Sequence, residues 1–513
     1  MRVSTNGGLV TENWFDLNAS RYTPSSTLQR MELLKTGYMG TLSLGWDNYL
    51  FLELTGRQER SSTLKDQSFF YPSANLSFLF TQAFHMPSWW NYGKLRLSYG
   101  IVGNAPETYT ANIVYEQGSD NGFTWNTIPS SWGNADIRPE KKYEYEIGLE
   151  SKFLNNRLGI DVSYYNNRVK DQILSTPQPS TSGVKNVLMN VGEVANHGWD
   201  ISISATPILT RDFRWDLTAN YGVYKNKVVK LADGVPYLEI LNSGGSGIKI
   251  QAVEGQPMGD IYAQVPQVNE NGEYLVSDKG LYLNQTELQK VGNINPAGVG
   301  GLFNSFSYKN VFLDFSIDFR IGGDVINEMN QYATAVGLTP ESLKYRDTEH
   351  GGLSYYYPGD NNSSGIPVQV DPSTGVGPNG EIIYHDGIIL PGVVASTGER
   401  NTRIIPAGYY YNTTYNWGTE AEQLTYRHSV FDNSYVKLRE LTIGYQFPEK
   451  IISKLGLGRL SVSVFGRNLF YFYKALKNYD AESSVGTSWA NQATVGSSTT
   501  ATRSFGVSLR ASF

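Results

Sequence analysis

Long stretches of the sequence alternate between apolar and polar residues, and the end of the chain shows this most clearly. From residue 505 to Phe513 the odd positions are apolar and the even positions are small or polar. The same alternation recurs at 143–150, 199–205, 213–223 and 313–320. Because successive side chains of a β-strand point to opposite faces, this pattern predicts two-faced strands, the last of which runs to the final residue.

Read at this period of two, the sequence predicts an all-β chain of about fourteen strands, most of them about 9–12 residues long. A tilted strand needs about 9–11 residues to cross a bilayer, whereas soluble strands are most often about 5–6 residues long. These lengths favour a transmembrane antiparallel β-barrel. The strands are expected near 11–20, 37–46, 48–58, 69–80, 93–102, 142–153, 157–167, 196–207, 212–225, 301–309, 311–321, 433–446, 459–470 and 503–513.

The connections between the predicted strands fall into two classes. Tight turns are expected at 47–48, 154–156, 209–211 and 309–310. Long links are expected at about 103–141, 168–195, 226–300, 322–432 and 471–502. Short and long connections that alternate are typical of an outer-membrane barrel with brief periplasmic turns and long extracellular loops. The last strand ends on the short-turn side, so the C-terminus is predicted to be periplasmic.

Two soluble architectures share this alternation, namely a large β-sandwich and a propeller. A propeller repeats at about 40–50 residues, and the sequence contains no such repeat. A sandwich with strands this long and a loop the length of 322–432 is uncommon. The pattern therefore favours the membrane barrel over both soluble alternatives.

The composition agrees with a membrane barrel and excludes several other classes. Charged residues make up 18% of the chain, against about 25% in soluble domains, and 35 tyrosines raise the aromatic share to 13%. The net charge of −6, with no basic face evident, excludes nucleic acid as a partner. The absence of cysteine excludes disulfides and thiolate metal sites. Residues 1–8 lack the apolar run of a secretory signal, so we expect either a removed export signal or a fragment of a longer chain.

Aromatic residues in the long links are the candidate substrate-binding residues. Aromatic rings flanked by Asn, Asp and Ser suit sugars or peptides, because apolar ring faces lie next to hydrogen-bonding groups. The alternative is that these rings pack the loops against one another. The candidates are Trp125, Trp132, Tyr355, Tyr356 and Tyr410.

Charged residues on the polar faces of strands are the candidate lumen-lining residues. On the strand predicted at 311–321 these are Asp314, Asp318 and Arg320. The five histidines lie in five separate segments, and no nucleophile, metal or nucleotide motif is present, so no enzymatic activity is expected. Residues 359–365 are rich in Asp and Asn, which suits Ca²⁺, but no glutamate closes the loop, and an ordinary polar loop is favoured. We therefore predict no catalytic site, metal or cofactor.

From about residue 69 onward the sequence resembles the C-terminal part of the SusC/RagA family of TonB-dependent outer-membrane transporters of Bacteroidetes. Short matching segments, in the same order, extend over most of the chain. They are Phe70–Ser77, Leu95–Asn104, Tyr145–Glu150, Asn156–Tyr165, Lys170–Leu174, Asn190–Gly198, Gly301–Asn310, Gly322–Asn327, Asp386–Gly392, Tyr435–Tyr445 and Gly466–Phe470.

The resemblance implies a 22-stranded barrel with an N-terminal plug, a SusD-like surface lipoprotein as lid, and energy supplied by TonB. It implies import of oligosaccharides or oligopeptides across the outer membrane, in contact with its lipid. The plug and the TonB box are not found in residues 1–513, so this chain is expected to supply the C-terminal portion of such a barrel. Two alternatives stay open: a barrel that serves as a structural scaffold of a larger outer-membrane complex, and a passive 14-stranded pore.

Overall fold

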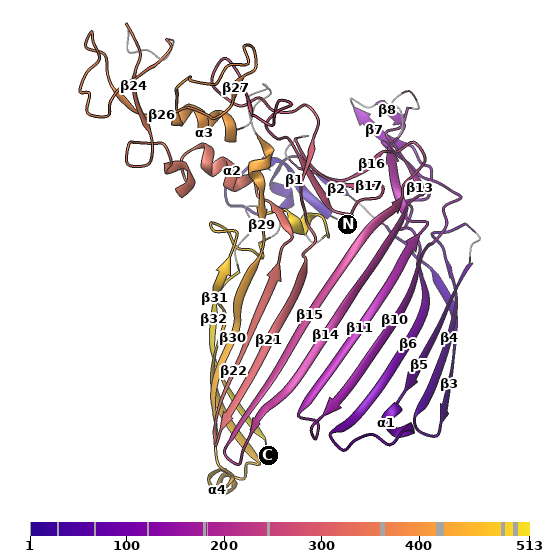
Figure 1. Ribbon diagram of the computed structural model, residues 1–513. Coiled ribbons are helices and arrows are strands. Elements are labelled where there is room, and N and C mark those ends of the chain that lie inside the picture. The colour runs from indigo at the N-terminus through magenta and orange to yellow at the C-terminus, as the bar shows by residue number, and fades with distance from the viewer. Residues whose placement is uncertain are drawn as a thin grey trace.

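A computed structural model describes residues 2–27, 30–65, 68–120, 123–177, 181, 183–243, 247–359, 365–416, 425–483, 488–495 and 501–512. Its largest element is one antiparallel sheet of thirteen strands (Figure 1). These strands are β3 (Lys35–Trp46), β4 (Leu50–Ser61), β5 (Ser68–Phe78), β6 (Trp90–Asn104), β10 (Glu140–Phe153), β11 (Leu158–Lys170), β14 (Glu193–Leu209), β15 (Phe213–Lys230), β21 (Gly298–Tyr308), β22 (Val311–Ile321), β30 (Tyr435–Gln446), β31 (Arg459–Lys474) and β32 (Ser504–Ser512).

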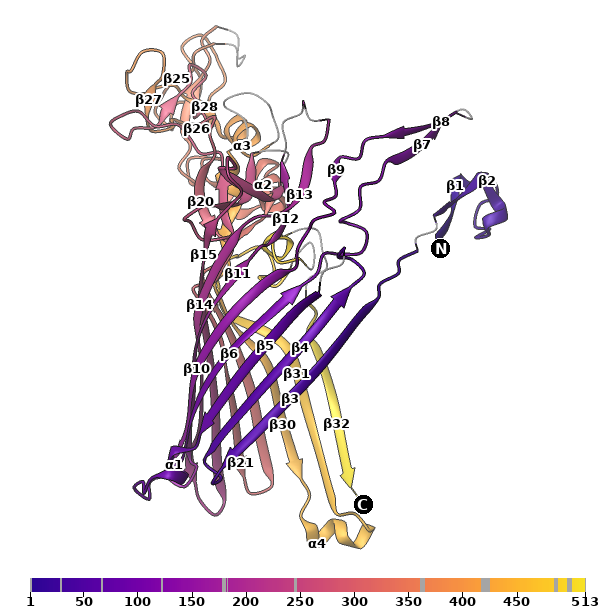
Figure 2. The ribbon, with the colours of Figure 1, turned by 90° about the vertical axis from the view of Figure 1, so that its right-hand side faces the viewer.

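The strands follow one another in the sheet in the order of the sequence, each antiparallel to the next. The sheet is therefore a simple meander, as the alternation of the sequence predicts. Figure 2 shows it curved into an open wall with tilted strands. Among the described residues, β3 and β32 form the two edges, and each pairs with one neighbour in this sheet.

The predicted all-β barrel wall is confirmed, but the prediction of a strand at 11–20 is wrong. That segment lies in a separate hairpin of β1 (Arg2–Leu9) and β2 (Ser20–Thr27). The short 3-10 helix Leu17–Ala19 interrupts it, and the Asp16 side chain accepts a hydrogen bond of 2.8 Å from the backbone N–H of Asn18. A capping aspartate of this kind offers the backbone an alternative to strand pairing.

The two faces of the sheet differ in polarity. One face carries large apolar side chains that are exposed in the described chain, among them Ile443 (53%) and Val464 (58%). Their neighbours Thr442 and Ser463 point to the opposite face. Monomeric soluble proteins rarely expose a continuous apolar area of this size, whereas lipid-facing walls do. Among the helices in the described residues, none is both long and apolar enough to cross a membrane.

Tight turns connect most strands at one rim, which we call the turn rim. Between β3 and β4, Asp47 and Asn48 both have positive φ (49° and 59°), as a type I′ hairpin turn requires. An aromatic cluster covers the same rim, with ring centroids of Trp90 and Phe153 5.4 Å apart and those of Trp89 and Trp90 6.0 Å apart. Aromatic girdles of this kind mark the interfaces of membrane barrels. The rim also carries α1 (Phe80–Ala83), α4 (Glu449–Ile452) and the 3-10 helix Ser453–Leu455.

Long links leave the opposite rim, the loop rim, and contain the remaining elements. The links at 105–139 and 171–192 contain β7 (Glu116–Asp120), β8 (Phe123–Thr127), β9 (Ser131–Trp132), β12 (Ile173–Pro177) and β13 (Asn186–Asn190). The link at 231–297 contains β16 (Tyr237–Ser243), β17 (Ile248–Val253), β18 (Asp260–Ala263), β19 (Leu275–Val276) and β20 (Gln289–Asn293). The links at 322–434 and 475–503 contain β23 (Asp324–Ile326), α2 (Glu328–Ala335), η4 (Pro340–Leu343), β24 (Leu353–Tyr356), β25 (Val368–Gln369), β26 (Tyr384–Ile388), β27 (Val393–Val394), β28 (Ile405–Pro406), α3 (Ala407–Tyr415), η5 (Tyr426–Ser429), β29 (Val430–Asp432) and η7 (Asn491–Ala493).

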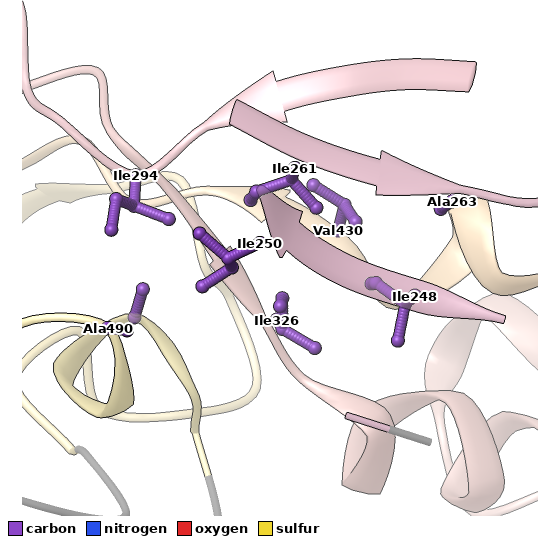
Figure 3. Close-up of a cluster of buried hydrophobic side chains, with 9 residues drawn as sticks. Ile248, Ile250, Ile261, Ala263, Ile294, Ile326, Val430 and Ala490 are labelled. Atoms are coloured by element: carbon purple, nitrogen blue, oxygen red, sulfur yellow. The ribbon is translucent and has the colours of Figure 1, made fainter. Parts of the chain in front are cut away.

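The links at 231–297, 322–434 and 475–503 share hydrophobic cores, and together we call them the three-loop unit. Figure 3 shows the largest core, to which all three links contribute. Its buried residues are Ile248, Ile250, Ile261, Ala263, Ile294, Ile326, Val430, Ala490 and Ala493. The links at 105–139 and 171–192 pack instead around a separate core of Leu64, Phe69 and Ile137. The loop rim therefore carries two independently packed groups.

The apolar face of β31 provides a test of the membrane assignment. Val464→Arg places a charge on that face near the middle of the strand, and we expect it to lower the free energy of unfolding in bilayers by about 2–4 kcal/mol. Ser463→Arg places the same charge on the polar face and should change the free energy of unfolding little. Denaturant unfolding in lipid vesicles measures both variants, and equal losses would contradict a lipid-facing surface at Val464.

Candidate functional site

The polar face of the sheet is concave and carries an open cavity of about 780 Å³. Its lining residues come from seven of the eight strands from β6 to β30, so it lies on the broad inner surface of the wall. Its lining is mostly charged, hydroxyl and amide groups together with glycine. The residues are Arg96, Asp161, Ser163, Asp200, Ile201, Ser202, Asn220, Tyr221, Gly222, Val299, Gly300, Gly301, Asp318, Phe319, Arg320 and Tyr435.

Glycine keeps part of the cavity floor open. Gly222 lies directly opposite Asp200 in the register of β14 and β15. A Cβ atom at Gly222 would lie 3.0 Å from Oδ1 of Asp200, closer than most real Cβ contacts. A side chain at this position would crowd the carboxylate and reduce the cavity.

An ion-pair network crosses the inner surface at Arg96. Its Nη2 lies 2.6 Å from Oδ1 of Asp161, and its Nη1 lies 3.1 Å from Oδ2 of the same carboxylate. Nη2 also donates to the Ser163 hydroxyl at 3.1 Å, and Nη1 lies 3.6 Å from Oε2 of Glu150. A guanidinium that binds one carboxylate through two hydrogen bonds holds its side chain in a fixed geometry. The charges on this part of the wall are therefore ordered, with one guanidinium shared by two carboxylates.

The three predicted lumen-lining residues occupy the polar face of β22, but only two reach the cavity. Asp318 lies in the lining, and its Oδ2 accepts from Nε of Arg439 at 2.5 Å. Arg320 also lies in the lining and donates to the carbonyl oxygens of Gly322 and Ile294, both at 3.1 Å. Asp314 lies nearer the turn rim, opposite Ser305 and Thr442, outside the cavity lining.

The two predicted tryptophans lie in the link at 105–139. Trp125 belongs to the hairpin of β7 and β8 and is 46% exposed. Trp132 lies in β9, which pairs in parallel with β13, and its ring contacts that of Tyr115 edge to face with centroids 6.4 Å apart. Trp125 therefore presents a ring to solvent, while Trp132 is partly covered.

The three predicted tyrosines lie in the link at 322–434. Tyr355 is only 1% exposed, and its ring stacks on Tyr384 at 5.5 Å. Tyr356, next to it on β24, is half-buried. Tyr410 packs in α3 against Tyr411 at 5.1 Å, and burial raises its pKa well above the ordinary value. For Tyr355 and Tyr410 the contacts favour the packing role, and the five predicted aromatic residues do not form one cluster.

Sequence reasoning missed the charged residues that connect the wall to the three-loop unit. Lys437, Arg439 and Glu440 follow one another closely on β30. Glu482 from the link at 475–503 pairs with Lys437 and Arg439, whereas Glu440 pairs with Arg467 within the wall. Three charged residues within four positions break the alternation of the strand. That break was the available signal for an irregular strand at this point.

Metal ligation has little support in the described part of the chain. No group of three or more His, Asp or Glu residues there lies close enough together to hold an ion. Residues 360–364, the centre of the segment considered for Ca²⁺, lie outside the described residues, as does Phe513.

In the three-loop unit the side chain of one histidine, His428, is half-buried. Its ring stacks on Tyr415 with centroids 4.4 Å apart. Burial, assisted by the neighbouring charge of Arg427, lowers the pKa of His428 from 6.5 to about 4. His428 is therefore neutral in the folded unit at physiological pH, whereas it becomes protonated below pH 6.5 once the unit unfolds.

This pKa predicts that the three-loop unit is less stable in mild acid. Because the unfolded state binds the proton more readily, the free energy of unfolding does not depend on this group above pH 6.5. It falls as the pH is lowered from 6.5 toward 4. We expect the free energy of unfolding to be roughly 2 kcal/mol lower at pH 5 than at pH 7.5 through this group alone. Urea unfolding followed by intrinsic fluorescence measures it, with His428→Gln as the matched variant. An equal pH dependence in both proteins would contradict the assignment.

Comparisons with known proteins place this wall in a family. The family described as "TonB dependent receptor-like, beta-barrel" matches residues 5–260. The chain is 24% identical over 494 residues to TonB-dependent receptor P3 of Formosa agariphila. The alignment covers 88% of this chain and 42% of that protein. It is 30% identical over 247 residues to TonB-dependent receptor SusC of Bacteroides thetaiotaomicron, covering 44% of this chain and 24% of that protein.

Solved structures share the fold. The RagAB peptide transporter superimposes with a TM-score of 0.63 at 19% identity, over 90% of this chain and 47% of that chain. The chain thus spans less than half the length of these relatives. It belongs to the TonB-dependent receptor-like β-barrel family and is of the SusC/RagA type.

Proposed function

We propose that this chain forms the C-terminal wall and three-loop unit of an importer that carries oligosaccharides or oligopeptides across the outer membrane. The observation that carries the proposal is the polar cavity of about 780 Å³ on the inner face of a sheet whose outer face is apolar. A wall that is apolar outside and polar inside suits a water-filled route through lipid. The structure named the RagAB peptide transporter supports peptide cargo, and the oligosaccharide alternative rests on the resemblance of the sequence to the SusC/RagA family.

We propose that the loop rim faces the outside of the cell. In outer-membrane barrels the long connections are extracellular and the short turns are periplasmic. The last described residues of β32 then lie at the periplasmic rim, beside α4 (Figure 1). Exposed aromatic residues of the loop rim, such as Phe123 and Trp125, are in this orientation the ones available to cargo or to a partner.

The proposal includes a SusD-like surface lipoprotein as the lid and TonB as the source of energy. The lipoprotein would rest on the loop rim, where the three-loop unit offers a packed platform. TonB would act through a plug carried elsewhere in the complete transporter. The similarity to SusC and RagAB supports both partners.

The two alternative functions receive less support. A passive pore closed by these strands alone requires β3 to pair with β32, and in the described residues these strands occupy opposite edges of the thirteen-stranded sheet. A purely structural scaffold does not require an open polar cavity on its inner surface. The transporter assignment accounts for both observations.

Excision of the longest link tests whether it handles cargo. β23 pairs with β29, and the backbone N–H of Asn327 donates to the carbonyl of Ser429 at 2.7 Å, so the two strands already form the base of a hairpin. Replacing residues 328–428 by Asn-Gly closes that hairpin with a two-residue turn. We expect the protein to reach the outer membrane but to lose uptake of its oligosaccharide or oligopeptide, measured with a labelled panel in whole cells.

The matched control shortens the opposite rim. Replacing residues 449–456, which contain α4, by Asn-Gly alters the turn rim and leaves the loop rim intact. Uptake is expected to persist in this variant. Undiminished uptake of every substrate after removal of 328–428 would contradict a cargo-handling role for that link.

A further inference from the structure

The wall contains an irregularity at Arg439, where β30 carries one extra residue. Against β22, Leu438 pairs with Ile317 and Glu440 pairs with Ser316. Against β31, Leu438 pairs with Phe470 and Glu440 with Arg467. Arg439 is therefore the extra residue of a β-bulge relative to β22, whereas against β31 the count is reversed, because Asn468 and Leu469 lie opposite Arg439 alone. A bulge bends a strand and redirects one side chain away from the regular alternation.

The redirected guanidinium joins the wall to the link at 475–503. Nε of Arg439 lies 2.5 Å from Oδ2 of Asp318 on β22, and Nη1 donates to Oδ1 of Asn468 on β31 at 2.9 Å. Nη1 also donates to Oε2 of Glu482 at 2.9 Å, and Nη2 binds the other carboxylate oxygen. One side chain thus contacts two wall strands and a carboxylate of the link.

A second cation of the wall depends on the same carboxylate. The Lys437 side chain is only 2% exposed, and its Nζ binds Glu482. The same Nζ lies 4.8 Å from the ring centroid of Tyr471. A buried cation that loses its counter-ion is strongly destabilising. Glu482 is therefore the counter-ion that Lys437 and Arg439 share, and Asp318 supplies a second negative charge to Arg439.

The electrostatics of Glu482 agree with this arrangement. Its burial raises its pKa, but the hydrogen bonds from Arg439 and Lys437 outweigh burial and hold the pKa below the ordinary value. The carboxylate is therefore charged at neutral pH. The ion pairs are present under the conditions in which an outer-membrane protein works.

Hydrogen bonds fix the residues around Glu482 as well. The Tyr471 hydroxyl donates to Oδ1 of Asp480 at 2.5 Å, and Nζ of Lys474 donates to the carbonyl of Tyr479 at 2.6 Å. Nδ2 of Asn433 donates to the carbonyl of Ala481 at 2.9 Å. The segment 479–482 is thus held against β30 and β31 along its whole length.

Other residues of the link at 475–503 contact the rest of the three-loop unit. Nδ2 of Asn478 lies 3.1 Å from Oδ1 of Asn330 in α2. The backbone N–H of Val495 donates to the carbonyl of Ile326 at 2.8 Å, and Ala490 and Ala493 lie in the shared hydrophobic core. Contacts that fix segment 479–482 to the wall therefore also help to fix the other two links, because the link at 475–503 packs against them.

We propose that Arg439 is a positioning residue: together with Lys437 it latches Glu482 to the inner wall and so fixes the three-loop unit on the barrel. This inference goes beyond the proposed transport function. The links at 105–139 and 171–192 pack around the other core, whose members include no residue of the three-loop unit. The latch therefore acts on one of the two packed groups of the loop rim.

Cysteine labelling tests the latch directly, because the chain has no cysteine of its own. Ala481→Cys introduces a thiol at a position that is 6% exposed, beside Glu482. In native membranes its rate of modification by a water-soluble maleimide reports how often the segment leaves the wall. Adding Glu482→Gln, which removes the charge but keeps the shape, should raise the rate at least about tenfold.

Two further variants separate positioning from general stability. Arg439→Lys keeps the charge but cannot reach all of its partners at once, so an intermediate rate is expected. Glu440→Gln removes the neighbouring ion pair to Arg467 (2.9 Å), which does not involve the link, so its rate should equal that of Ala481→Cys alone. The folded barrel, measured by its heat-dependent electrophoretic mobility, should be unchanged in every variant.

Some results would overturn the proposal. It is wrong if Glu482→Gln leaves the labelling rate unchanged, or if Glu440→Gln raises the rate as much as Glu482→Gln does. Loss of uptake in Glu482→Gln without faster labelling would also overturn it, because Glu482 would then act in some way other than as a latch. Labelling needs no substrate, so this result does not depend on the proposed transport function.

Discussion

The whole structure depends on one constraint: backbone groups at membrane depth must form hydrogen bonds within the protein. Water is not available there, so an extended chain satisfies its N–H and C=O groups only by pairing with neighbouring strands. The thirteen strands do this in sequence order, from β3 to β32. Once pairing and tilt are fixed, the alternation of side chains places Leu313, Phe315 and Ile317 on the apolar face and their neighbours on the polar face. The long links are then confined to one rim and the turns to the other.

The charges of the inner face are arranged within this frame. Arg96 and Asp161 balance each other inside the regular register, since both lie on the polar face of their strands. At Arg439 the register itself changes, and the extra residue carries the guanidinium toward Asp318 and Glu482. The irregularity thus occurs where the wall meets the three-loop unit. The regular wall and the packed loops are connected at the point where the strand departs from the alternation.

Most of the wall could be predicted from the sequence, because a period of two repeated over nine or more residues is a strong local signal. The segment at 11–20 failed because Asp16 caps a short helical turn, which an alternation count does not register. The three-loop unit could not be predicted, since its core joins residues as distant as Ile248 and Ala493. For the same reason the burial of Tyr355 was not visible: its partner Tyr384 lies in another strand of the loop. The placement of Asp318 and Arg320 on the polar face followed directly from the strand pattern, and their lumen-lining role stays a prediction.

The central claim is that one face of this sheet contacts lipid while the other lines an aqueous route. The most direct measurement is single-cysteine scanning of β22 from 313 to 318 in native membranes, with a charged maleimide and a lipid-soluble one. The account predicts that cysteines at 314, 316 and 318 react with the charged reagent. Cysteines at 313, 315 and 317 should react only with the lipid-soluble reagent. Equal reaction of all six positions with the charged reagent would contradict a membrane-spanning wall.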